Sequence, residues 1–231
     1  MIKIFLLFCC SSLMVGAKAQ PDPLRDFNKH VVENWSGDYI RIGPYRVKGS
    51  PFFLGESFPG VIKYKGGKTV TDIKVLYNLY NQKAGVDVNH DIFEANDAVA
   101  EFQVQLPSKF GGQTLLFKNT NQYQKESAEE FLNVLAEGSK AAFFKQYKTK
   151  LQADPTNTLS KDDKVFEQYY EYYLYTMASP GLHKIKLRSK DVLKELGEDP
   201  QIKEYVLKNH MDLSKEEDVI QLINKYNNSF N

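Results

Sequence analysis

The sequence predicts an α+β protein in which a mainly antiparallel sheet, curled into a barrel or a sandwich, is closed by a C-terminal cap of short helices. Apolar residues alternate with polar ones along much of 39–188, and this two-residue period is typical of strands. Turns that contain glycine separate the alternating runs. From Ser189 onward the period changes to that of amphipathic helices.

Residues 1–19 have the three regions of a secretory signal peptide. Lys3 gives a positive start, 4–15 is an apolar run, and Ala17-Lys-Ala19 fits the cleavage site. The apolar run is too short to span a bilayer. We therefore expect export, and a mature chain that begins at Gln20 and has no transmembrane segment.

Both cysteines of the chain, Cys9 and Cys10, lie in this segment. A lipid anchor on either is the alternative interpretation, although Phe8 precedes Cys9 where a lipoprotein signal needs a small residue. Without these cysteines the mature chain has no thiol for a disulfide, a thiolate metal site or a cysteine nucleophile. Cleavage also removes Lys3 and Lys18, so the formal net charge of +1 falls by two and leaves no basic excess for nucleic acid.

The lead-in, 20–38, has a short helical pattern and contains Trp35, the only tryptophan of the chain. A β-rich domain is predicted over 39–188. Its central hairpin is 70–88, with Asn81-Gln-Lys83 and Gly85 as turn residues. A second hairpin is predicted around Gly66-Gly67. A type I′ turn needs positive φ at both central residues, so we expect Gly66→Val to cost about 1 kcal/mol.

The remaining predicted strands are less sharply bounded. A capping box at 127–130 makes a helix the alternative at 131–136, but Gly138 and the aromatic residues after it favour strands. The polar stretch 151–164 predicts an exposed loop. The strands predicted outside the two hairpins cover 39–47, 91–95, 100–106, 114–117, 131–136, 141–147, 169–175 and 182–187.

Three short helices are predicted over 189–231. Ser189 caps the first, which Gly197 ends; Pro200 opens the second; and Ser214-Lys-Glu-Glu217 is a capping box for the third. Each is too short to be stable alone. They must therefore pack on one another and on the sheet as a cap.

Two separate stretches carry a resemblance to a known family. One is Gly49-Ser-Pro-Phe-Phe-Leu54 with the glycine hairpin and Leu76-Tyr-Asn-Leu-Tyr-Asn81; the other is 185–193 with Asn224-Lys-Tyr-Asn227. Together they resemble uncharacterised exported proteins of Gram-negative bacteria. The resemblance implies export to the periplasm or the outer membrane and a fold of sheet plus helices. It implies no catalytic residues.

Four sequence patterns bear on possible chemistry. Gly66-Gly-Lys-Thr69 lacks the first glycine and the helix of a phosphate loop, so a hairpin turn is favoured. The stretch 87–91 resembles the start of a calcium loop but lacks its glycine and glutamate, so a polar turn is favoured. The histidines, at 30, 90, 183 and 210, have no metal-site spacing, and no Gly-x-Ser-x-Gly elbow is present. No cofactor or metal is therefore expected.

The tyrosine run 169–175 is the main candidate contact surface. Tyrosines at alternate positions can stack on sugar rings or contact a protein, although half-buried core positions are the alternative. We expect 184–188 to form a solvated basic edge beside it, and Asn227-Asn-Ser229 is a formal glycosylation sequence. The candidate surface residues are Tyr170, Tyr172, Tyr173, Tyr175 and Trp35.

Three functions stay open. The first is a non-enzymatic exported protein that acts as an accessory or interaction subunit, with a protein partner in an envelope complex. The second is a module that binds a glycan or another small ligand through the sheet tyrosines. The third is a hydrolase whose site is not visible in the sequence.

Overall fold

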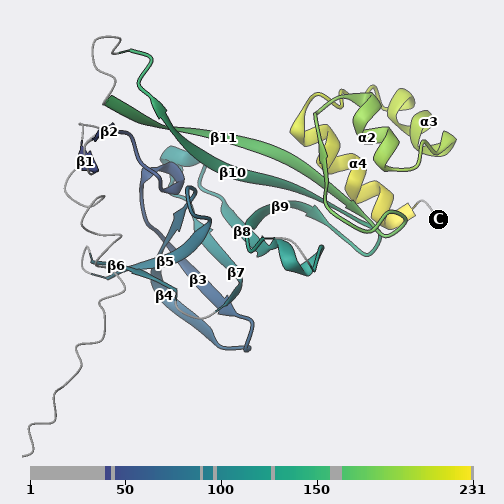
Figure 1. Ribbon diagram of the computed structural model, residues 1–231. Coiled ribbons are helices and arrows are strands. Elements are labelled where there is room, and N and C mark those ends of the chain that lie inside the picture. The colour runs from purple at the N-terminus through teal and green to yellow at the C-terminus, as the bar shows by residue number, and fades with distance from the viewer. Residues whose placement is uncertain are drawn as a thin grey trace, which may run out of the picture.

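The computed structural model describes residues 40–42, 45–88, 91–95, 98–125, 128–156 and 163–229. Within these ranges the chain forms one mostly antiparallel sheet with three helices packed at one end (Figure 1). The predicted signal peptide at 1–19, the lead-in with Trp35, and the histidines at 30 and 90 lie outside the described residues.

The sheet has the strand order β1-β2-β11-β10-β9-β8-β7-β3-β4-β5-β6, and β12 pairs with β11. The pairing of β2 with β11 is parallel. Because β1 and β6 end the series, the sheet in the described part of the chain is open, and the closed barrel expected as one alternative is wrong. The strands are β1 (Ile40–Ile42), β2 (Tyr45–Lys48), β3 (Phe58–Tyr64), β4 (Thr69–Asn78), β5 (Lys83–Val88), β6 (Asp91–Glu94), β7 (Val99–Gln105), β8 (Thr114–Asn119), β9 (Phe131–Glu137), β10 (Ala141–Ala153), β11 (Asp163–Thr176) and β12 (His183–Ile185).

One half of the sheet curls around a core of aromatic side chains. The Tyr77 ring of β4 lies 5.2 Å from Phe102 and 5.4 Å from Phe117, measured between ring centroids. A 3₁₀ turn, η1 (Phe53–Gly55), adds Phe53, whose ring lies 4.8 Å from that of Tyr147 on β10. The curl therefore brings β4 and β10 to the same core although they are far apart in strand order.

A buried glutamine joins the two sides of this curl. The Gln82 Nε2 atom donates to the carbonyl oxygens of Leu79 at 2.9 Å and Tyr147 at 3.1 Å, and Oε1 accepts from the Tyr77 hydroxyl at 2.6 Å. Burial raises the pKa of Tyr77 well above its ordinary value. The β4–β5 turn itself is shaped by Asn78, whose Oδ1 accepts from the Tyr80 amide at 2.9 Å.

The predicted role of Gly85 in that turn is wrong. Gly85 lies inside β5, and a Cβ at this position would come within 2.7 Å of the Phe93 carbonyl oxygen on β6. Gly85 therefore permits the close approach of β6 rather than the turn.

The hairpin around Gly66-Gly67 is confirmed, but its turn type differs from the expectation. Gly67 has φ of 86°, and its amide donates to the Tyr64 carbonyl at 2.9 Å. Gly66 has no left-handed φ and open space around its Cα. This is the pattern of a three-residue loop that ends in a left-handed glycine. The expected cost of Gly66→Val is therefore wrong, and the strain belongs to Gly67.

The hairpin of β9 and β10 is confirmed, and the loop predicted at 151–164 is shorter than expected. β10 continues to Ala153 and β11 starts at Asp163. The two strands pair without interruption, from Ala141 opposite Thr176 to Ala153 opposite Lys164. They form the longest hairpin of the described fold, and it connects the curled half of the sheet to the helices (Figure 1).

The helices are α2 (Ser189–Glu195), α3 (Pro200–Lys208) and α4 (Glu216–Ser229), close to the predicted positions. Gly197 has the expected left-handed φ of 82°, and Asp199 caps α3 by accepting from the Gln201 amide at 2.8 Å. The predicted cap of α2 is wrong, since Ser189 is already its first helical residue. The Ser214 hydroxyl, expected to cap α4, instead donates to Asp212 at 2.6 Å.

The helical cap covers the end of the β10–β11 hairpin that contains Phe143 and Leu174. Val192, Ile202 and Leu222 are completely buried in this second core. Asn227 of α4 then fastens the cap to the β9–β10 turn: its Oδ1 accepts from the amides of Lys140 at 3.0 Å and Ala141 at 2.9 Å. A Cβ at Gly138 would lie 2.3 Å from Asn227 Cγ, so this contact requires glycine.

Candidate functional site

The tyrosine run of the sequence lies on β11, and its side chains are divided between the two faces of the sheet. The register pairs Tyr170 with Tyr147 and Tyr172 with Lys145 on one face, whereas Tyr173 pairs with Phe144 on the other. Tyr175 shares the face of Tyr173. The four predicted β11 residues therefore do not form one surface, and Trp35 lies outside the described residues.

On the first face, three tyrosine rings surround the ammonium group of Lys145. The Nζ atom lies 4.4 Å from the centroid of Tyr170, 5.5 Å from that of Tyr172 and 5.6 Å from that of Tyr147. These distances are within the range of cation–π attraction. Lys145 is therefore held in place by aromatic side chains from both strands of the hairpin.

Glu216, in the first turn of α4, completes this cluster. Its Oε2 lies 2.8 Å from Lys145 Nζ and accepts from the Tyr172 hydroxyl at 2.6 Å. Burial raises the pKa of Tyr172 above its ordinary value, and the hydrogen bond to Glu216 adds to the effect. Burial by itself lowers the pKa of Lys145, but the hydrogen bond with Glu216 opposes it and the net shift is upward. The cluster therefore attaches the helical cap to the sheet.

On the opposite face, Tyr173 and Tyr175 belong to a small core. The Tyr173 hydroxyl donates to Glu171 at 2.9 Å, and the ring of Tyr175 lies 5.5 Å from that of Tyr123. Burial raises the pKa of Tyr173, and the bond to Glu171 adds to this shift. Tyr173 and Tyr175 are therefore half-buried core residues, which is the alternative to a contact surface.

The exposed part of the run is the middle of β11. Glu167, Gln168, Tyr169 and Tyr170 are four consecutive exposed residues. Tyr170 is 54% exposed and Tyr169 is 39% exposed. Tyr169 is not among the predicted contact residues, because its exposure follows from the lack of a neighbouring strand beside 167–170 in the described part of the chain and not from the local pattern.

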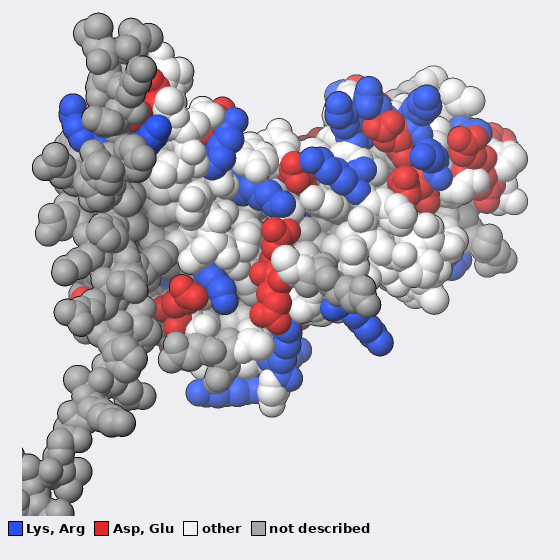
Figure 2. Space-filling view, in the orientation of Figure 1, with Lys and Arg blue, Asp and Glu red and all other residues white. Residues whose placement is uncertain are grey.

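The basic edge expected at 184–188 is largely neutralised. Lys184 pairs with Glu171 at 2.5 Å, and Arg188 pairs with Asp191 at 3.1 Å. Lys186 is exposed and has no ion pair within the described chain. Blue and red side chains are interspersed over the face in Figure 2, with no broad region of a single sign.

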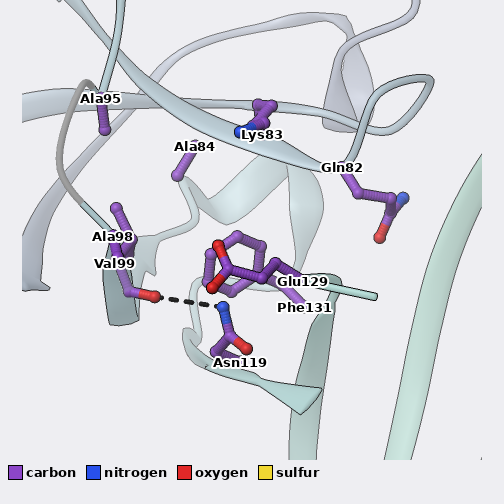
Figure 3. A pocket seen from close by; sticks show the side chains of 9 residues that line it. All are labelled: Gln82, Lys83, Ala84, Ala95, Ala98, Val99, Asn119, Glu129 and Phe131. Carbon is purple, nitrogen blue, oxygen red and sulfur yellow. Dashed lines mark hydrogen bonds between the residues drawn. The ribbon is translucent and has the colours of Figure 1, made fainter. Parts of the chain in front are cut away.

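A separate pocket of about 200 Å³ opens beside the curled core (Figure 3). The small side chains of Ala84, Ala95 and Ala98 leave its space, and Phe131 and Val99 form its apolar wall. Its polar lining consists of Gln82, Lys83, Asn119 and Glu129.

The polar groups of this pocket already have partners in the fold. The amide of Asn119 donates to the Val99 carbonyl at 3.2 Å, and Glu129 pairs with Lys65 at 2.5 Å. Lys83 lies 3.9 Å from Glu94. The pocket has about a fifth to two-thirds of the volume of a typical small-molecule site, so it has space for a small ligand.

The other predicted polar motifs have structural surroundings. Asp87 accepts from the Ser57 hydroxyl at 2.7 Å, and His183 Nδ1 lies 3.4 Å from Glu195. Among the residues that the structure describes, no group of three or more histidine, cysteine or acidic residues is arranged to hold a metal ion. A wider hollow at the β3–β4 bulge is lined mainly by polar residues around Gly60 and Asp72.

Comparison of the chain with protein-family models, curated proteins and solved structures found no match. None of the helices in the described ranges is long and apolar enough to cross a membrane.

Proposed function

We propose that the chain is a non-enzymatic exported protein that acts as an accessory or interaction subunit in the periplasm or at the outer membrane. Its contact surface would be the middle of β11, which we call the β11 surface and define as residues 167–171. The observation that carries this proposal is the pair of exposed tyrosines at its centre, Tyr169 and Tyr170. Tyrosine is enriched among the residues that contribute most to protein–protein binding.

The surroundings of these tyrosines support a protein partner. Charged pairs, Lys150 with Glu167 and Lys184 with Glu171, flank the aromatic side chains. An aromatic centre with a polar rim is the usual composition of a protein interface. The Lys145–Glu216 cluster beneath Tyr170 holds this ring in a fixed position, which reduces the entropy lost on binding.

The groups with shifted pKa values support a binding role over catalysis. Burial, together with hydrogen bonds to carboxylates, raises the pKa of Tyr172 and Tyr173. For Glu171 burial alone would raise the pKa, but the hydrogen bonds from Lys184 and Tyr173 outweigh it and lower the pKa. These bonds join strands or attach the helical cap. Perturbed groups at structural ion pairs stabilise a fold, whereas catalytic groups converge on a substrate pocket. The resemblance to exported proteins and the signal peptide support the location, which stays a prediction.

Site-specific photo-crosslinking in the native cell tests the proposal. A benzophenone side chain placed at Tyr169 or Tyr170 is expected to capture one distinct protein, identified by mass spectrometry after mild-detergent extraction. Leu207, which is 75% exposed on α3, is the control position. The proposal is wrong if positions 169 and 170 capture nothing, or capture the same mixture as position 207.

The pocket supports a second candidate function, a small-ligand module. The specific observation is that three alanines, Ala84, Ala95 and Ala98, line the pocket and leave its space open. The substitution Ala98→Leu would fill this space without changing the hydrogen-bonded groups. A ligand that binds there should lose affinity in this variant, while binding to the β11 surface is unchanged. Screening a fragment library by NMR against the protein and Ala98→Leu tests this candidate; shifts that are identical in the two proteins would exclude the pocket.

A further inference from the structure

Among the residues that the structure describes, no strand pairs with the outer edge of β11 in its middle, although strands flank this edge at both ends. β2 pairs with Asp163, Lys164 and Val165, and β12 pairs with Tyr172, Tyr173 and Leu174. Gly49, which follows β2, lies against the Phe166 backbone, since a Cβ at Gly49 would be 3.1 Å from the Phe166 carbonyl oxygen. The opening therefore spans residues 167–171. At a rise of about 3.3 Å per residue it is roughly 17 Å long, which is the length of a typical strand.

The backbone groups that face this opening follow from the pairing with β10. The Asp154 amide donates to the Asp163 carbonyl at 2.9 Å, and the Met177 amide donates to the Lys140 carbonyl at 2.8 Å. Because bonding direction alternates along a strand, the odd-numbered residues of β11 face β10 and the even-numbered residues face the outer edge. The N–H and C=O groups of Gln168 and Tyr170 therefore point into the opening.

The opening is exposed, and its tyrosines lie on both sides of the edge. Tyr170 is on the face that carries Lys145, and Tyr169 is on the opposite face. A strand added here would place successive side chains on alternate faces, so that one packs on Tyr170 and the next on Tyr169. This arrangement provides main-chain hydrogen bonds and aromatic contacts to the same incoming segment.

The charges at the two ends of the opening indicate the composition of that segment. Lys48 ends β2 and Lys186 follows β12; both are exposed and neither has an ion pair within the described chain. The carboxylates nearer the centre, Glu167 and Glu171, are already paired with lysines. Acidic residues near both ends of an extended peptide would complement the two lysines.

We propose that the β11 surface binds an extended, acidic segment of a partner protein by strand addition between β2 and β12. This inference rests on the proposed function and specifies the mode of binding. Main-chain hydrogen bonds to Gln168 and Tyr170 would supply affinity, and the two tyrosines and two lysines would supply specificity.

A single proline substitution, at Gln168, tests the strand addition. Gln168→Pro removes an amide that points into the opening and leaves the bonds to β10 intact, and proline is tolerated at such edge positions. Gln168→Ala is the matched control, because both variants lose the bonds from the Gln168 side chain to the carbonyls of Ser50 and Phe52.

The probe is a phage-displayed library of random dodecapeptides, selected on the purified protein. The selected peptides should be acidic, should bind Gln168→Ala within about twofold of the parent, and should bind Gln168→Pro at least about tenfold more weakly. The double variant K48E/K186E should weaken them severalfold and remove most of the salt dependence. Melting curves of the variants check that each is folded.

Each other outcome overturns a defined part of the account. Equal binding to Gln168→Pro and Gln168→Ala, or no selected peptides, would contradict strand addition even if crosslinking at Tyr170 finds a partner. Selected edge-binding peptides without a crosslinked partner in cells would instead contradict the proposed function. A dimer in sedimentation that Gln168→Pro dissociates would mean that the edge pairs with a second copy of this chain, and not with a partner protein.

Discussion

Removing the amide of Asn227 should detach the helical cap from the sheet. Asn227→Ala loses three hydrogen bonds: Oδ1 to the amides of Lys140 and Ala141, and Nδ2 to the Ala141 carbonyl at 3.0 Å. At about 0.5–1.5 kcal/mol for each bond, and with part of the loss recovered by water at this half-buried site, we expect a cost of about 2 kcal/mol in the free energy of unfolding.

Asn228→Ala is the matched control, because Asn228 is the next residue of α4, is exposed and makes no side-chain hydrogen bond among those of the described chain. Alanine favours a helix over asparagine, so the control should be unchanged or a few tenths of a kcal/mol more stable. Urea unfolding followed by circular dichroism measures the free energy of unfolding of both variants. In thermal unfolding of a chain of this size, a cost of about 2 kcal/mol corresponds to a melting temperature about 4–8 °C lower for Asn227→Ala.

Gly138→Ala provides an independent check of the same contact. Its Cβ would lie within 2.7 Å of three atoms of Asn227, so Asn227 must move and its bonds must break. The double variant with Asn227→Ala should therefore cost less than the sum of the two single changes. Equal stability of Asn227→Ala and Asn228→Ala, or strict additivity with Gly138→Ala, would refute the reasoning.

Three further predictions concern the sheet. Gly67→Val should cost about 1 kcal/mol or more because of its φ of 86°, whereas Gly66→Val should cost only a few tenths, and thermal unfolding of the pair measures the difference. Tyr77→Phe should cost about 1–3 kcal/mol, because the Oε1 atom of Gln82 stays buried without its donor; an unchanged urea midpoint would contradict this. The pKa of Tyr172 is raised above 10.0 in the folded state, so its contribution to the free energy of unfolding is complete below about pH 10 and is lost as the pH rises further. The pKa of Glu171 is lowered from 4.5, so its contribution to the free energy of unfolding is lost as the pH falls below that value. Urea unfolding from pH 3 to 12 should show both declines, and Tyr172→Phe should reduce the alkaline one only.

Local features of the fold could be predicted from the sequence. Hairpins at 58–78 and 70–88 and the three C-terminal helices follow from short-range periodicity, turn residues and caps, and the structure confirms them. The turn type at Gly66-Gly67 could not be predicted, because two glycines permit several loops and the registers of β3 and β4 decide between them.

The division of the tyrosines required the register of β11, which local patterns do not specify. A shift of one residue exchanges the faces of a strand, and 169–175 has tyrosines on both faces, at 169, 173 and 175 on one and at 170 and 172 on the other. The contacts of Gln82 with Tyr147 and of Asn227 with Ala141 join residues 65 and 86 positions apart, so they were beyond local reasoning. The exposure of Tyr169 likewise depends on where β2 and β12 end.

Residue-resolved amide hydrogen exchange across the β11 surface tests the central claim most directly. In the purified protein the amides of Gln168 and Tyr170 should exchange rapidly, while those of Glu167, Tyr169 and Glu171, which face β10, should be protected. A selected edge-binding peptide should then protect Gln168 and Tyr170. Protection of all five amides in the protein alone would mean that the edge is already paired, and would contradict the account.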